Sequence, residues 1–310
     1  MNFISRLSIH INRLLLTRAK NGPYRFLIKN IEKITTLRLA EKILSTEYFK
    51  DILVPIELQV ENWQSILVIA PHQDDETIGA GGALVKAKAA GARIHIAYIT
   101  DGGLINYPGG IDKSIKVRFN EAEKVCDYLN AEIHKIGISN YEPIILENHI
   151  QKLAILIKNI QPDLIFIPWM LDSPPKHRLA NHMLAVVQKL NHLNKIEVWG
   201  YQVHNMLPAN GYIDITSQVS QKKELLNIYK SQNDLYCPYN HSTIGMNAWN
   251  SRFLSSELQL SEPKYVEIFF TLPINEYCKL VGQFYEMDLN DTYGSDPKTL
   301  QGVKKWLNLL

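Results

Sequence analysis

The stretch ILVIAPHQDDETIGAGG, residues 66–82, joins five apolar residues to a histidine, three acids and a run of small residues. A short apolar run of this kind is typical of a strand that is buried on both faces of a sheet. Four ionisable side chains follow it at once, His72, Asp74, Asp75 and Glu76. Because ligands of open α/β sheets bind at the carboxyl ends of strands, this pattern indicates a functional site there.

The elements around this stretch alternate between strand and helix. Residues 65–70 are predicted as a buried strand, 81–92 as a helix and 93–102 as a second strand, which together form a βαβ unit. The alternation continues through predicted helices at 116–130, 149–162, 177–190 and 217–232 and predicted strands at 163–169 and 196–204. We therefore expect a doubly wound α/β domain with a parallel sheet.

The composition is that of an ordinary globular protein. The chain has 310 residues, of which 46% are hydrophobic and 21% are charged. Its cysteines, Cys126, Cys237 and Cys278, lack CxxC spacing, so the sequence predicts neither a disulfide framework nor a cysteine-based zinc site. With no apolar stretch long enough to span a bilayer and no convincing signal peptide, we expect a cytoplasmic protein.

The N-terminal region is strongly basic. Residues 1–50 contain ten Lys or Arg residues and three acids. We place a boundary near residue 60, between a basic helical segment at 1–60 and the α/β domain at 61–310. Two interpretations of the segment stay open: peripheral contact with an anionic membrane at its inner face, or a helical cap or oligomer contact packed on the domain. The oligomeric state is not predicted, and we expect no nucleic-acid partner.

A metal site accounts for the acidic stretch better than a nucleotide site. The small residues at 79–83 lack GxGxxG spacing, and the acids before them would repel a pyrophosphate. His72 and a carboxylate three residues later can reach one cation, while a second carboxylate accepts a proton from the attacking water. His177, beside the strand at 163–169, is the expected third ligand. The mixed donors suit zinc (Zn²⁺), although another divalent metal also fits. The simpler alternative is a solvated loop at a helix N-terminus.

The sequence resembles a known enzyme family in five stretches. PHQDDETIGAGG is similar to the P-H-P-D-D-E signature of the LmbE/PIG-L-like N-acetylglucosamine deacetylases. The resemblance covers about residues 64–235, through ITDGG (99–103), VRFNEAE (117–123), IPWMLDSPPKHRLANH (167–182) and, less specifically, YIDITSQVSQKKELLNIYKSQ (212–232). It implies a zinc-dependent hydrolase with a Rossmann-like fold, a three-layer sandwich around a mostly parallel sheet.

The resemblance also implies roles for single residues. His72, Asp75 and His177 match the zinc ligands, and Asp74 matches the general base that activates water. Arg118 matches an arginine that the family uses near the substrate.

Two acids are expected to support these groups. Glu121, one helical turn after Arg118, is expected to hold that arginine, with a surface ion pair as the alternative. Asp172 is expected to contact a sugar hydroxyl or to orient His177, with a plain loop acid as the alternative.

Two positions depart from the family pattern. Gln73 replaces the second proline of the signature, where we expect little effect because that residue contributes backbone geometry. Pro174 stands where many members have a histidine that stabilises the oxyanion. His204, at the end of the strand at 196–204, is the expected replacement, with His182 and Lys176 as alternatives.

The expected activity is removal of the acetyl group from an N-acetylated amino sugar, an N-acetylhexosamine of the GlcNAc type. The basic N-terminal segment favours a substrate in a glycolipid or other glycoconjugate precursor, as in cell-surface polysaccharide biosynthesis. The alternatives are a soluble small-molecule glycoside and a non-catalytic carbohydrate-binding homologue. The glycine-rich loop at 101–112 is expected to act as a lid or sugar-binding loop.

Overall fold

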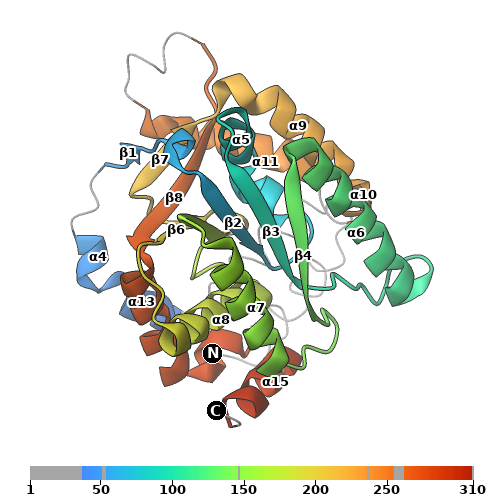
Figure 1. Ribbon diagram of the computed structural model, residues 1–310, viewed down its shortest axis with the longest axis vertical. Helices are drawn as coiled ribbons and strands as arrows, with labels where there is room; N and C mark the ends of the chain where they lie inside the picture. Colours follow the sequence, from blue (N-terminus) through green and yellow to red (C-terminus); the bar gives the residue numbers. More distant parts are fainter. Residues whose placement is uncertain (1–36, 51–53, 146, 236–237, 255–261, 309–310) are drawn as a thin grey trace, which may run out of the picture.

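The computed structural model describes residues 37–50, 54–145, 147–235, 238–254 and 262–308 (Figure 1). Its centre is an eight-stranded sheet with the order β1-β7-β8-β6-β5-β2-β3-β4. The strands are β1 (Ile56–Glu57), β2 (Ser65–Ala70), β3 (Arg93–Thr100), β4 (Ala131–Ile138), β5 (Leu164–Pro168), β6 (Glu197–Tyr201), β7 (Gly211–Asp214) and β8 (Val266–Pro273). Only β8 runs antiparallel to its neighbours, β6 and β7, within the described sheet. The expected mostly parallel α/β fold is confirmed.

Helices cover both faces of this sheet (Figure 1). Because successive strand residues point to opposite faces, Leu67 and Ile69 of β2 join one apolar core while Ile66 and Val68 join the other. One face carries α5 (Asp75–Ala89), α6 (Gly110–Leu129), α9 (Val219–Ile228), α10 (Lys230–Leu235) and α11 (Tyr239–Asn250). The other carries α3 (Leu37–Leu44), α4 (Glu47–Lys50), α7 (Glu147–Ile160), α8 (Pro175–Asn191), α13 (Ile274–Met287), α14 (Leu289–Tyr293) and α15 (Pro297–Leu307).

The order of the strands creates a crevice between β2 and β5. From β2 the chain builds β3 and β4 on one side, and it then crosses to build β5 and β6 on the other. The connections that leave the carboxyl ends of β2 and β5 therefore diverge, which is the usual place for a ligand in such a sheet.

Several predicted elements have different bounds in the structure. Helix α5 begins at Asp75 instead of residue 81, so Gly79 and Ala80, which were predicted to precede the helix, are helical. Helix α6 begins at Gly110, inside the loop predicted at 101–112. The helix predicted at 217–232 is divided into α9 and α10, and the strand predicted to reach residue 204 ends at Tyr201. Strands β1, β4, β7 and β8 were not predicted.

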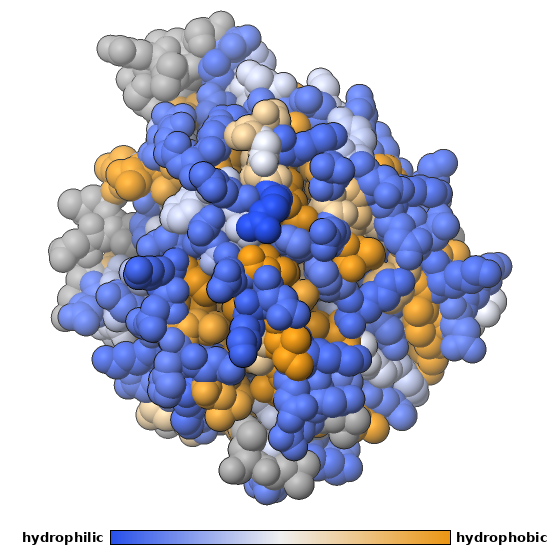
Figure 2. Space-filling model, viewed as in Figure 1, coloured by the Kyte–Doolittle hydropathy of each residue, from blue (hydrophilic) through white to orange (hydrophobic). Residues whose placement is uncertain are grey.

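The described part of the basic N-terminal segment packs on the α/β domain. Leu39 and Ile43 of α3 are buried in the core, and Phe49 of α4 stacks on Phe270 with ring centroids 4.7 Å apart. Residues 1–36 lie outside the described residues, so the membrane contact and the boundary near residue 60 stay predictions. Among the described helices, none has the length and apolarity that crossing a bilayer requires. The face in Figure 2 is mainly hydrophilic, with apolar side chains in separate patches.

Candidate active site

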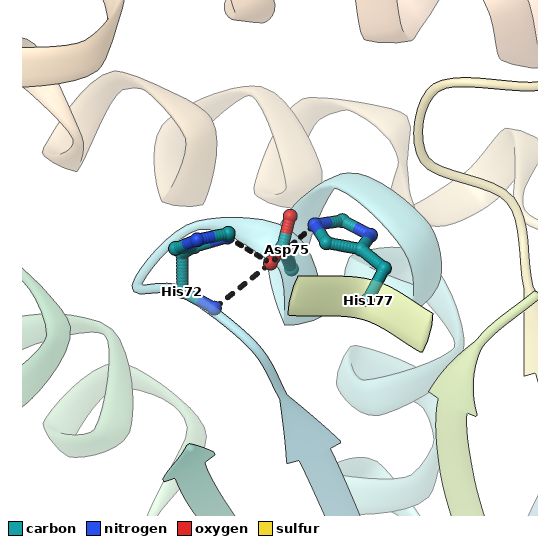
Figure 3. A group of neighbouring side chains, drawn as sticks. All are labelled: His72, Asp75 and His177. Carbon is teal, nitrogen blue, oxygen red and sulfur yellow. Dashed lines mark hydrogen bonds and ion pairs between the residues drawn. The ribbon is translucent and has the colours of Figure 1, made fainter. Parts of the chain in front are cut away.

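Three side chains meet at the crevice between β2 and β5 (Figure 3). His72 lies in the turn after β2, Asp75 is the first residue of α5, and His177 lies in the first turn of α8. Oδ2 of Asp75 lies 3.2 Å from Nδ1 of His72 and 3.2 Å from Nε2 of His177. One candidate ligand atom from each residue lies within 4.8 Å of the others. The structure thus brings together the three residues that the sequence predicts as metal ligands.

The donor set fits a divalent cation. In a tetrahedral site with bonds of ~2.0–2.1 Å, neighbouring ligand atoms lie about 3.3 Å apart, close to the two 3.2 Å separations here. Nε2 of His177 is buried and, apart from its 3.2 Å ion pair with Asp75, has no polar partner among the described residues. Burial lowers the pKa of His177, but the carboxylates of Asp75 and Asp172 outweigh it and raise the pKa to about 10. The surroundings of Nε2 therefore favour positive charge, which a cation supplies.

Two further side chains fix the rings of the histidines. Asp172 Oδ2 accepts a hydrogen bond from Nδ1 of His177 at 2.8 Å. Asn140 Oδ1 accepts one from Nε2 of His72 at 3.1 Å. These bonds turn Nδ1 of His72 and Nε2 of His177 toward Asp75, as the partners of metal-binding histidines commonly do. Asn140 was not predicted, because it follows the unpredicted strand β4.

Asp172 supports the site from the interior. Its side chain is 0% exposed, and its Oδ1 also accepts the backbone N–H groups of His204 and Asn205 at 3.2 and 2.9 Å. A sugar hydroxyl cannot reach it there, so the expectation of a substrate contact is not supported. The alternative expectation, that Asp172 orients His177, agrees with the 2.8 Å hydrogen bond.

Asp74 occupies an unusual backbone conformation beside the ligands. Its φ is 137°, a region that residues other than glycine rarely adopt and that is often retained at functional sites. Nη2 of Arg118 lies 3.3 Å from Oδ1 of Asp74 and donates to the carbonyl of Gln73 at 2.8 Å. Burial raises the pKa of Asp74 well above its usual value, and Arg118 opposes this shift. Arg118 therefore holds the carboxylate and the turn that carries it.

The predicted surroundings of Arg118 need correction. Its side chain is only 3% exposed and contacts the acidic turn, so its first contact is with Asp74 and the backbone. Glu121 accepts the backbone N–H and the hydroxyl of Ser231 in α10, at 2.9 and 2.6 Å. The predicted Arg118–Glu121 pair is wrong, and so is the surface ion pair, because Glu121 is buried and faces α10.

The alternatives for an oxyanion donor lie in different places. The His204 ring lies 5.1 Å from the His177 ring, and burial lowers the pKa of His204 to about 4, so its imidazole is neutral. His182 is buried among Tyr285, Tyr293 and Trp306 and bonds to the Tyr293 hydroxyl at 2.9 Å, which places it in the core instead of the site.

Lys176 and Pro174 stand at the start of α8. Nζ of Lys176 lies 2.6 Å from Asp296, and Pro174 is the N-cap residue of the helix. His204 therefore stays the candidate donor from the sequence.

Two neighbours of the ligands have contacts that the sequence did not reveal. Gln73 is buried, and its side chain donates to the carbonyl of Thr100 in β3 at 3.1 Å. Its contribution is thus more than backbone geometry, contrary to the prediction. Glu76 accepts hydrogen bonds from the Tyr229 hydroxyl at 2.6 Å and from the backbone N–H of Asp74 at 3.2 Å. Both residues hold the turn in which the site is built.

A hollow of about 280 Å³ lies near the candidate ligands, although its lining contains none of them. Asn140, which contacts His72, forms part of its wall, and Lys176, which precedes His177, forms another part. The loops after β3 and β4 and the α15 region complete it through Gly103, Leu104, Ile105, Asn106, Tyr141, Asp296 and Lys298. Its lining combines polar side chains with the apolar Leu104 and Ile105, a mixture that suits a sugar.

Comparison with known families agrees with this site. The sequence profile of the family described as PIG-L, GlcNAc-PI de-N-acetylase, matches residues 67–188. These residues form a PIG-L family domain. The match includes His72, Asp75 and His177, and it confirms the resemblance seen in the sequence.

Solved structures similar to the chain that carries this PIG-L domain share its fold. N,N′-diacetylchitobiose deacetylase from Pyrococcus horikoshii has 20% identity and a TM-score of 0.58, over 78% of this chain and 94% of that one. The 4-carboxy-2-hydroxymuconate hydratase from Pseudomonas putida has 19% identity and a TM-score of 0.57, over 67% and 96%. A conserved protein from Thermus thermophilus has 21% identity and a TM-score of 0.55, over 66% and 93%. The fold thus carries more than one reaction, so the reaction must be argued from the site.

Proposed function

We propose that this chain is a zinc-dependent N-deacetylase that hydrolyses the acetamide of an N-acetylhexosamine of the GlcNAc type. The observation that carries the proposal is the convergence of His72, Asp75 and His177, inside a PIG-L family domain, with the carboxylate of Asp74 in the same turn. The diacetylchitobiose deacetylase with the same fold acts, by its name, on an N-acetylated sugar.

His72, Asp75 and His177 would hold the cation, and two nitrogen donors with one carboxylate suit zinc. When bound, the cation would polarise the amide carbonyl and lower the pKa of water. Asp74 takes the proton from the attacking water and returns it to the leaving nitrogen as the C–N bond breaks, so the products are acetate and a free amine.

Positioning residues and a hydrogen-bond donor complete the mechanism. Arg118 keeps the Asp74 carboxylate in place through its 3.3 Å contact. His204 donates a hydrogen bond from its neutral ring to the oxyanion, a contribution of about 3–4 kcal/mol when one such donor is removed from a hydrolase. It does so in place of the histidine that Pro174 replaces.

The substrate proposed is a glycolipid or other glycoconjugate precursor. The hollow beside Asn140 is the proposed place of the sugar, and Lys298 in its wall would favour an anionic substituent, since Lys176 is already paired with Asp296. The basic residues of 1–36 would add peripheral contact with an anionic membrane on the cytoplasmic side. A soluble small-molecule glycoside and a carbohydrate-binding role without catalysis are the alternatives.

Amine release from N-acetylglucosaminides in the presence of Zn²⁺ tests this function. We expect the wild-type protein to release amine, and we expect Asp74→Asn to be slower by about 10²- to 10⁴-fold, the usual contribution of a general base. Asp127→Asn, at an exposed position near the end of α6, is the matched control and should keep full activity. A zinc-loaded wild-type protein that releases no amine from any such substrate would favour the binding role instead.

A further inference from the structure

A second group of metal-binding side chains lies on β3 and the edge strand β4. In the register of the two strands His95 pairs with Glu132 and Ala97 pairs with His134. Since alternate residues of a strand share a face, the side chains of His95, Glu132 and His134 lie on the same face of the sheet. The structure has one ligand atom from each within 4.8 Å of the others.

The separations match those of a tetrahedral metal site. Nδ1 of His95 lies 3.2 Å from Nε2 of His134 and 3.4 Å from a carboxylate oxygen of Glu132. Bonds of ~2.0–2.1 Å in tetrahedral geometry place ligand atoms about 3.3 Å apart. We infer that His95, Glu132 and His134 bind a second divalent cation of the zinc type, in a site separate from the active site.

The two sites cannot share one ion. His95 lies five residues before Thr100, the last residue of β3, whereas the active site lies beyond the carboxyl ends of the strands. At ~3.3 Å per strand residue the distance along β3 is about 17 Å. The proposal therefore stands whether or not the active site performs the proposed reaction.

The position of the group gives the ion a structural use. β4 is the edge of the sheet, and its first five residues are only partly buried or exposed, whereas Ile136 and Ile138 near its end are buried in the core beside α7. A cation held by His95 and the two β4 residues would fasten this half of β4 to β3 where apolar packing is sparse.

Solvent can reach the group. The Glu132 side chain is 74% exposed, and a hollow of about 460 Å³ is lined by His95, Glu132 and their neighbours. Three protein ligands leave a coordination position to water, so the ion should exchange with the medium. The competing explanation is a hydrogen bond between neutral His95 and His134 at 3.2 Å, with no ion.

Zinc stoichiometry after equilibrium dialysis of the full-length protein separates the two explanations. We expect about two equivalents of zinc per wild-type chain and about one in His134→Gln, because tight zinc binding needs at least three protein ligands and the variant keeps only two at this site. Glu132→Gln should also lose one equivalent, and its exposed position guards against a folding defect. His241→Gln, on the exposed surface of α11, is the matched control and should bind as wild type.

Cobalt provides an independent readout. We expect the variant His72→Ala/His177→Ala, which lacks two active-site donors, still to show the visible absorption of tetrahedral Co²⁺, and we expect added His134→Gln to abolish it. Zinc should raise the melting temperature of that double variant but not of the triple one. No Co²⁺ absorption in the double variant, or zinc contents of His134→Gln and Glu132→Gln equal to that of wild type, would overturn the inference.

Discussion

Asp172 connects the two halves of the candidate site. It accepts the Nδ1 proton of His177 and the backbone N–H groups of the loop that carries His204. A charge in this position raises the electron density of the imidazole that faces the cation, as the carboxylate partners of zinc-bound histidines do. The negative charge of Asp172, beyond its shape, should therefore contribute to metal affinity.

Replacement Asp172→Asn keeps the shape of this side chain and removes its charge. We expect zinc affinity at the active site to fall about 10- to 100-fold, the usual effect of losing such a partner. Competition with a chromogenic chelator measures it, preferably in the His134→Gln background so that one site is read. Asp127→Asn should bind as wild type, and equal affinity of the two variants would show that the charge of Asp172 has no role.

The sequence predicts the three candidate metal ligands better than it predicts the residues that hold those ligands in place. His72, Asp75 and His177 follow predicted strands, and parallel strands bring their carboxyl ends to one edge, so their meeting could be expected. The partners of Glu121 and Asn140 depend on contacts between elements distant in the chain, Ser231 and His72. No local pattern records which side chains cross those distances.

Helix α5 begins at Asp75, whereas the sequence predicts its start at residue 81, and the packing of its glycines explains the difference. Glycine is a poor helix former, so the helix was predicted to begin only at residue 81, after Gly79 and Ala80. In the structure a Cβ at Gly79 would overlap the ring of Tyr201, and one at Gly82 would lie 2.6 Å from Cγ2 of Ile215. The glycines are thus explained by close packing of α5 on its neighbours. Strand β8 was not predicted from the sequence. Its pairing with β6 and β7 joins segments that lie far apart in the chain, and no local pattern indicates such a pairing.

Alanine at either glycine should destabilise the protein. We expect Gly79→Ala and Gly82→Ala to lower the free energy of unfolding by about 1–3 kcal/mol, the cost of overpacking a core. Gly245→Ala in α11 is the matched control: no atom lies within 4 Å of its added Cβ, and it should stabilise the helix by about 0.5–1 kcal/mol. Urea unfolding measures all three, and three equal values would contradict close packing as the reason for these glycines.

The molecule as a whole places its chemistry where strand order reverses. β2 and β5 are neighbours in the sheet, yet 93 residues lie between the end of β2 at Ala70 and the start of β5 at Leu164. These residues include β3, β4 and the helices that follow them. This arrangement could be predicted from the alternation of strands and helices, but the reaction could not, because a deacetylase and a hydratase share the fold. The reaction rests on the donors that the strand ends present.

Removal and return of zinc, with both products measured, tests the central claim most directly. The account predicts that chelator-treated protein releases neither acetate nor amine from an N-acetylglucosaminide, and that added Zn²⁺ restores both in equal amounts, because hydrolysis of one amide yields one of each. Release that persists without metal, or a zinc-restored protein that forms no amine, would contradict it.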